Sequence, residues 1–110
     1  MSAELPTELV EIVEHFPTFW AEAGHLMTET LYAESKLDRK TIELVLCALL
    51  AGRRWELGVK THAAKALEFG ASADDVRGAI LLSFAVFGTS SAAAGLHWAE
   101  QAMEEAGLTS

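Results

Sequence analysis

Cysteine is almost missing from this chain of 110 residues, because Cys47 is the single one. One cysteine forms no disulfide within the chain, no Cys-x-x-Cys pair and no cysteine-rich metal site. Proline is nearly as scarce, with two residues, and no segment alternates apolar and polar residues as a half-buried strand does. These absences exclude a fold held together by disulfides or cysteine-bound metal, and they favour an all-α chain.

Basic residues are also few, with 8 Lys and Arg against 16 Asp and Glu, which gives a net charge of -8. This balance disfavours nucleic acid and anionic membrane surfaces as partners. The longest strongly apolar run covers residues 44–51, too short to span a bilayer. The first six residues lack the basic start and apolar run of a signal peptide. We therefore expect a cytoplasmic protein without a membrane segment.

Apolar residues are abundant, at 51% of the sequence. A chain of this length forms one domain with a core of limited size, so we expect a single domain over residues 1–110. That apolar share is more than a small monomer easily hides, and part of it is expected to face another subunit. We therefore expect a homo-oligomer, whose number of subunits the composition leaves open.

Apolar residues recur at helical spacing along the whole chain. We expect about six helices, near residues 6–15, 18–33, 38–52, 55–69, 72–88 and 90–107. Asp38 is a good N-cap, Gly70 a good C-terminal cap, and Ser72 with Asp75 resembles a capping box. The third helix becomes apolar on every side from Leu44 onward, which places it at the centre of the fold.

Two polar residues stand out within this apolar central region, Glu43 in the third expected helix and His62 in the fourth. A buried carboxylate or imidazole costs free energy unless it has a partner. The two side chains are able to form a carboxylate–imidazole pair across adjacent antiparallel helices. Such a pair fixes the tautomer of the imidazole and suits general acid–base catalysis near neutral pH. A histidine bonded to a glutamate for purely structural reasons would give the same pattern.

The residues around this pair resemble the carboxymuconolactone decarboxylase family, which includes the alkylhydroperoxidase D proteins. The likeness lies in the block H-x-x-x-A-x-x-x-G-A-S from His62 to Ser72, in a glutamate nineteen residues earlier within K-T-x-E-L, and in flanking segments. It covers about residues 37–106. The resemblance implies an all-helical fold and a homo-oligomer, often a trimer or hexamer.

The family's peroxidase branch carries a Cys-x-x-Cys pair whose second cysteine lies four residues before the histidine. Those two positions are occupied here by Trp55 and Gly58, so the disulfide cycle of that branch cannot run. Cys47, one turn after Glu43, makes a one-cysteine peroxidase conceivable. A neighbouring carboxylate and an apolar setting raise the pKa of a thiol, however, whereas a reactive cysteine needs a low pKa. A buried, inert Cys47 is the expected role.

The branch without the cysteine pair resembles enzymes that decarboxylate a carboxylated lactone with no metal or organic cofactor. The resemblance then implies that His62 is the catalytic acid or base and Glu43 its orienting partner. Arg53 and Arg54 are candidates for binding an anionic substrate, and Trp55 is a candidate wall of the pocket. We predict no metal site. Two alternatives stay open: peroxide reduction of the alkylhydroperoxidase type, and a non-catalytic helical binding or assembly module.

Overall fold

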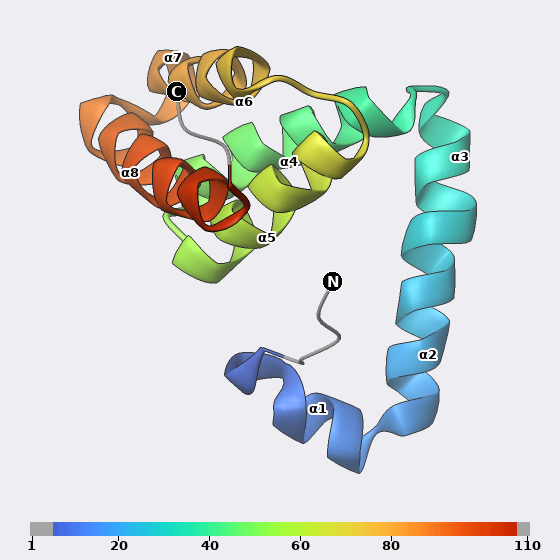
Figure 1. The fold of residues 1–110 in the computed structure, drawn as a ribbon. Coiled ribbons are helices and arrows are strands. Elements are labelled where there is room, and N and C mark those ends of the chain that lie inside the picture. Colours follow the sequence, from blue (N-terminus) through green and yellow to red (C-terminus); the bar gives the residue numbers. More distant parts are fainter. Residues whose placement is uncertain (1–5, 108–110) are drawn as a thin grey trace. The chain divides into compact units, whose positions relative to one another are not determined.

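The computed structural model describes residues 6–107 and divides the chain into two compact units, Met1–Leu37 and Asp38–Ser110. Figure 1 shows that the described part of both units is helical, and no strand occurs among residues 6–107. The expected all-α fold is thereby confirmed. No helix within these residues is both long enough and apolar enough to cross a membrane.

The first unit is a run of short helical segments: η1 (Thr7–Leu9), α1 (Val10–His15), α2 (Pro17–His25), η2 (Leu26–Leu31) and α3 (Tyr32–Ser35). Pro17 begins α2 at the one place where a missing N–H costs a helix nothing, so the expected break at this proline is confirmed. The next helix continues without a gap to Ser35, but its middle part, η2, is π-helical. There the Thr28 hydroxyl donates to the carbonyl of Gly24, 2.9 Å away, and competes with the regular backbone ladder.

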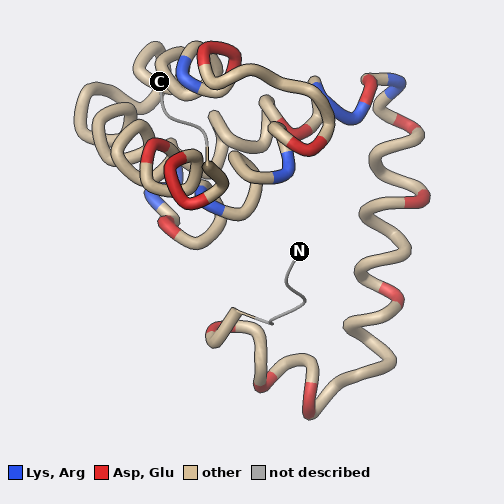
Figure 2. Tube along the Cα trace, viewed as in Figure 1, with Lys and Arg blue, Asp and Glu red and all other residues tan. Residues whose placement is uncertain are grey.

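Charge is distributed unevenly along the first unit. Every Asp, Glu, Lys or Arg between residues 6 and 35 is a glutamate, as Figure 2 shows by the absence of blue along α1, α2 and η2. Apolar residues of the same helices stay exposed, among them Phe19, Leu26, Met27 and Leu31. This unit therefore combines an acidic and an apolar character on one run of helix.

The second unit contains α4 (Arg39–Arg53), α5 (Glu56–Glu68), α6 (Ala73–Leu81), α7 (Phe84–Phe87) and α8 (Thr89–Glu105). Asp38 caps α4 by accepting a hydrogen bond from the Thr41 N–H, and Ser72 and Asp75 form the expected capping box of α6. Gly70, with φ of 101°, follows the end of α5 in the left-handed conformation that favours glycine. These local predictions are confirmed.

Helix α4 lies at the centre of the second unit and packs against α5, α6 and α8. Its crossing with α8 is close, because a Cβ on Gly95 would come within 2.5 Å of the Ala51 Cβ. The absence of a side chain at Gly95 thus allows this tight packing. The core around this crossing is made of small and medium apolar side chains: Cys47, Ala51, Val59, Ala63, Ala66, Val76, Ile80, Ala99 and Met103.

The fifth expected helix differs from the prediction, because it is broken between Leu81 and Phe84 into α6 and α7. The buried Ser83 donates its hydroxyl to the carbonyl of Ile80, 2.7 Å away, and thereby interrupts the helical ladder. The break leaves the apolar residues that follow it exposed: Leu82, Phe84, Val86 and Phe87. Apolar periodicity alone does not reveal such a break, since it continues across both helices.

Candidate active site

Glu43 lies on α4 among apolar neighbours and has no solvent exposure. Each of its carboxylate oxygens has one partner. The Arg39 Nε donates to Oε2 at 2.8 Å from the preceding turn of α4, and the His62 Nδ1 lies 2.6 Å from Oε1 across from α5. The two sequence-predicted residues are therefore brought together as a carboxylate–imidazole pair, with Arg39 as a third member.

The surroundings of Glu43 favour its ionised form. Burial raises the pKa of the Glu43 carboxyl, but the hydrogen bonds and charges of His62 and Arg39 outweigh burial and lower the pKa below its usual value of 4.5. Against a carboxylate, the Nδ1–H of His62 is the donor, so a neutral imidazole carries its free lone pair on Nε2. This is the tautomer that a general base needs.

The imidazole of His62 remains reachable from solvent. Its side chain is 19% exposed, whereas that of Glu43 is fully buried. Nε2 bonds to no other described residue. No fully buried side-chain nitrogen or oxygen within residues 6–107 lacks a partner, so Nε2 keeps contact with solvent. The arrangement holds one ring nitrogen in the protein and offers the other to a small molecule.

Cys47 lies on α4, one turn after Glu43, and is completely buried. Burial and the negative charge of Glu43 raise the pKa of its thiol to about 12. A thiol with this pKa is essentially never a thiolate at neutral pH, and the thiolate is the reactive form. Cys47 is therefore placed as a small apolar core residue.

Trp55 and Gly58 occupy the positions of the cysteine pair in the peroxidase branch, and they pack against each other. A Cβ on Gly58 would come within 2.7 Å of the Trp55 ring and 2.8 Å of a Leu50 methyl. The indole thus fills the space that a side chain at position 58 would need. Trp55 is half-buried at the start of α5, two turns before His62 on the same helix.

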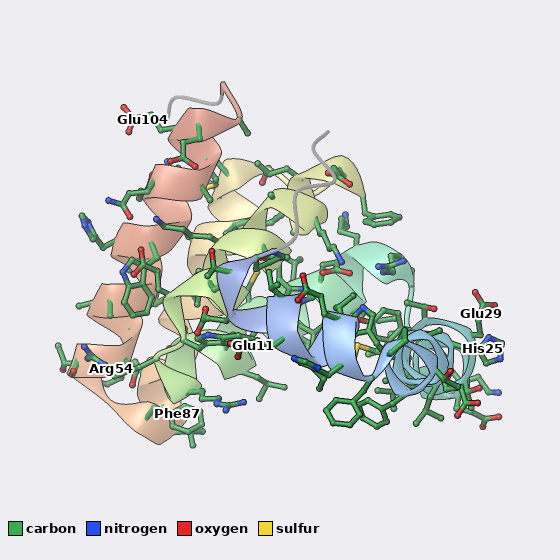
Figure 3. The ribbon with its side chains drawn as sticks, turned by 90° about the horizontal axis from the view of Figure 1, so that it is seen from below. Glu11, His25, Glu29, Arg54, Phe87 and Glu104 are labelled. Carbon is green, nitrogen blue, oxygen red and sulfur yellow. The ribbon has the colours of Figure 1, made fainter. Side chains whose placement is uncertain are left out.

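The two candidate substrate-binding arginines lie away from the pair along α4. Arg53 is ten residues beyond Glu43, which corresponds to about 15 Å along a helix axis, and its guanidinium lies 5.6 Å from the Trp55 ring centre. Arg54 donates to the carbonyl and the hydroxyl of Ser90 at the start of α8. Figure 3 shows Arg54 and Phe87 at the same end of the second unit, with Glu104 at the other end of α8. Their substrate-binding role remains a prediction that this geometry does not support.

Sequence reasoning missed Arg39. The information was present, since Arg39 and Glu43 are four residues apart, the spacing that places two side chains on one helix face. Within residues 6–107, no three His, Cys, Asp or Glu side chains are grouped so that they could hold a metal ion.

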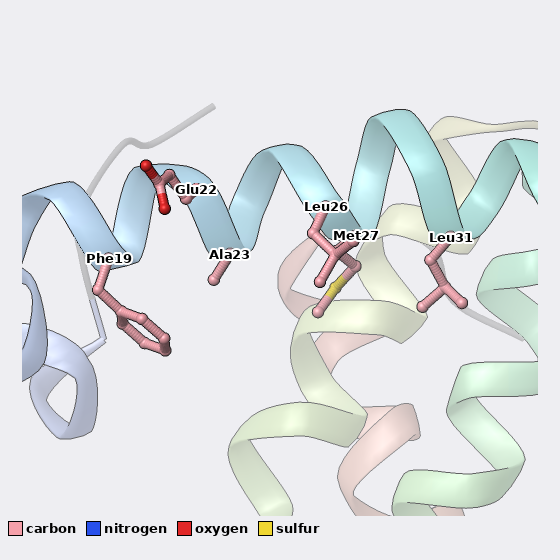
Figure 4. Close-up of a pocket in the computed structure, with 6 residues that line it drawn as sticks. All are labelled: Phe19, Glu22, Ala23, Leu26, Met27 and Leu31. Atoms are coloured by element: carbon pink, nitrogen blue, oxygen red, sulfur yellow. The ribbon is translucent and has the colours of Figure 1, made fainter.

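The first unit carries a groove of its own. It is a shallow apolar groove of about 390 Å³ along α2 and η2, lined by Phe19, Glu22, Ala23, Leu26, Met27 and Leu31. Figure 4 shows Phe19, Ala23, Met27 and Leu31 projecting from one side of the helix. The lining contains one carboxylate and otherwise only apolar side chains, which suits hydrophobic contact and not catalysis.

Comparison with known proteins identifies a family to which the chain is similar. The family model described as "Carboxymuconolactone decarboxylase family" matches residues 16–101. This match includes α2, and so begins earlier than the resemblance over residues 37–106 suggests. An uncharacterized protein of Methanocaldococcus jannaschii, MJ1511, is 32% identical over 78 residues, covering 70% of this chain and 72% of the relative. No solved structure matches the chain.

Proposed function

Since the chain belongs to the carboxymuconolactone decarboxylase family, we propose that it is an enzyme performing cofactor-free acid–base chemistry on a small carbonyl or lactone compound. His62 is the catalytic acid or base, and Glu43 is its orienting partner. One observation carries the proposal: a fully buried carboxylate bonds Nδ1 of His62 at 2.6 Å, while Nε2 stays available to a ligand.

The chemistry follows from this geometry. Nε2 of the neutral imidazole takes a proton from the carbon beside a carbonyl group, and the ionised Glu43 stabilises the resulting imidazolium. With a carboxylated lactone, loss of carbon dioxide leaves an electron pair delocalised onto the carbonyl. In this reaction no proton is first taken from carbon: the imidazolium Nε2–H donates its proton to the carbon that lost carbon dioxide. Solvent then reprotonates Nε2, so one proton is consumed for each carbon dioxide released. The Glu43–His62 pair serves both directions, because Nδ1 stays bonded throughout.

Peroxide reduction is the weaker alternative. It requires a thiolate, and the sole cysteine of the chain has its pKa raised to about 12. The positions of the family's cysteine pair are filled by Trp55 and Gly58, which pack together. Both observations favour acid–base chemistry over a thiol cycle.

We also propose that the enzyme is a homo-oligomer, with a second copy of this chain covering its exposed apolar surfaces. Leu81, Leu82, Phe84, Val86 and Phe87, named here the α6–α7 surface, are between 48% and 79% exposed. Side chains of this size expose on the order of 500 Å² together, at the upper end of what a monomer leaves uncovered. The groove along α2 and η2 on the first unit is a separate apolar surface that a partner copy could cover.

The proposal predicts that His62→Asn abolishes turnover without unfolding the protein. Wild type and variant are compared on γ-carboxymuconolactone and on a panel of small uncharged lactones, followed by loss of substrate absorbance and release of carbon dioxide. We expect kcat to fall by at least about 100-fold, because general acid–base catalysis contributes that much or more. The matched control is His97→Asn, a change at an exposed histidine of α8.

Three results would contradict the proposal. Equal turnover by wild type and His62→Asn removes the assigned role of His62. Consumption of an organic hydroperoxide with a thiol reductant, lost in Cys47→Ser, favours the peroxidase alternative. A wild type that turns over no lactone, with His62→Asn changing only stability, favours the non-catalytic module.

A further inference from the structure

Arg39 stands at the first position of α4, where a cation is unfavourable. The N-terminal end of a helix carries partial positive charge, so acidic residues stabilise it and basic residues do not. The order Arg then Glu at a spacing of four is also the weaker orientation for a helical ion pair. Helix stability therefore does not explain an arginine at this position. Its contacts do.

The guanidinium of Arg39 is fixed on two sides. Its Nε donates to Glu43 Oε2 at 2.8 Å, and its central carbon lies 4.5 Å above the ring centre of Phe69, at the end of α5. An arginine over an aromatic face is held by cation–π attraction and loses little further freedom on bonding a carboxylate. Arg39 is 32% exposed while Glu43 is fully buried, so the cation lies between the carboxylate and solvent.

We infer that Arg39 is a positioning residue for the His62 base, which it serves by keeping the Glu43 carboxylate ionised and oriented in both protonation states of the imidazole. This inference rests on the proposed function for its catalytic consequence, but its electrostatic part concerns Glu43 alone. When His62 is neutral, it offers Glu43 a hydrogen bond but no charge. A fully buried carboxylate then needs a permanent cation, and a guanidinium supplies one at every physiological pH.

The charged surroundings of Glu43 are simple enough to isolate this effect. From its own helix it meets Arg39, and from α5 it meets His62. Cys47 on α4 senses the charge of Glu43 but is protonated. On the other packed helices, Asp74 and Arg77 of α6 and Glu100 of α8 pair with one another. Removing Arg39 therefore leaves His62 as the sole positive partner of Glu43 among the described residues.

The test compares Arg39→Gln with Arg39→Lys, and uses Arg77→Gln as the matched control, since Arg77 also bridges carboxylates but on α6 and α8. The first readout needs no substrate: a pH titration of the Glu43 side-chain carboxyl by carbon-13 NMR. We expect Arg39→Gln to raise the Glu43 pKa by about one unit, the scale of one lost charge partner. Arg39→Lys should retain most of the wild-type value.

The second readout is kinetic. In Arg39→Gln the Glu43 carboxyl takes up a proton at higher pH than in wild type, so the acidic limb of the kcat/KM profile moves up by about one unit. We expect kcat at neutral pH to fall about 10–100-fold, the range for partners behind a catalytic ligand, with KM changed less than twofold. Arg39→Lys should restore the position of the acidic limb and most of kcat. If Arg39 served only for packing, a lysine would not restore them.

The two readouts separate the failure of this inference from that of the proposed function. If Glu43 titrates identically in wild type, Arg39→Gln and Arg77→Gln, the inference is overturned whatever the activity. If the Glu43 pKa rises as expected and no lactone is turned over, the role of Arg39 stands and the proposed reaction is wrong. If Arg39→Gln does not fold, Arg39→Ala replaces it in both measurements. A raised Glu43 pKa in Arg39→Ala would support the inference. An unchanged Glu43 pKa together with an unchanged acidic limb of the kcat/KM profile would overturn it.

Discussion

The free energy that Glu43 contributes to folding depends on pH, and the direction follows from its surroundings. Its pKa in the folded protein lies below the ordinary value of 4.5. A carboxyl whose pKa is lowered by folding contributes stability in full above its unfolded pKa, and this contribution declines as pH falls through the folded pKa. The contribution is therefore constant near neutrality and decreases below about pH 4.5.

This predicts a pH-dependent cost for Glu43→Gln. At pH 7 we expect the free energy of unfolding to fall by about 3 kcal/mol, because one partner of a buried ion pair is removed. The difference from wild type should shrink as pH decreases below 4.5, measured by urea unfolding between pH 7 and 3. Glu104→Gln, at the exposed end of α8, is the control and should change little at any pH. A cost that is the same at pH 3 and pH 7 would contradict the argument.

At the residue level, the Glu43–His62 contact could be anticipated because isolated polar residues in an apolar segment need partners. The positions of Arg53 and Arg54 could not. Both arginines follow Glu43 closely in the sequence, but the straight course of α4 separates them from it along the helix axis. Where the chain leaves α4, Arg54 turns to Ser90 in α8, a contact between residues 36 apart that no local pattern indicates.

Among the helices, ends marked by capping residues were predictable, and irregularities inside a continuous helical pattern were not. Asp38, Gly70 and the Ser72–Asp75 pair act through hydrogen bonds to their own helix ends, so the sequence reveals them. At the break between α6 and α7 the buried Ser83 donates to the Ile80 carbonyl, and within the π-helical stretch η2 Thr28 donates to the Gly24 carbonyl. Both residues look ordinary in a helical pattern.

The surroundings of two helical glycines, Gly58 in α5 and Gly78 in α6, predict opposite effects when each is replaced by alanine. Gly58→Ala should lower the free energy of unfolding by about 1–3 kcal/mol, because the new Cβ overlaps the Trp55 ring and a Leu50 methyl. Gly78→Ala in α6 should raise it by about 0.5–1 kcal/mol, since nothing lies within 4 Å of its Cβ and alanine favours a helix. Thermal and urea unfolding measure both. A stabilising Gly58→Ala would show that the indole does not fill this space.

Across the whole molecule, the apolar surfaces decide how the chain behaves in solution. We predict that wild type sediments as an oligomer at micromolar concentration and that the double change Leu82→Glu and Val86→Glu shifts it towards monomer. Two carboxylates in the α6–α7 surface would have to be desolvated in any interface. The control is Ala93→Glu with His97→Glu, which has the same spacing on an exposed part of α8. A monomeric wild type would overturn the proposed assembly.

The packing of Trp55 against Gly58 restricts which mutations could convert one branch of the family into the other. Replacing Gly58 alone brings a side chain into the indole, and replacing Trp55 alone leaves an unfilled space beside Leu50. Each single step towards a cysteine pair is therefore penalised by the residue that has not yet changed. The double replacement relieves the overlap with the indole, and the contact with the Leu50 methyls remains. The absence of a cysteine pair in this chain is thus protected by the mutual dependence of two positions, and a mutational route between the two chemistries must change both.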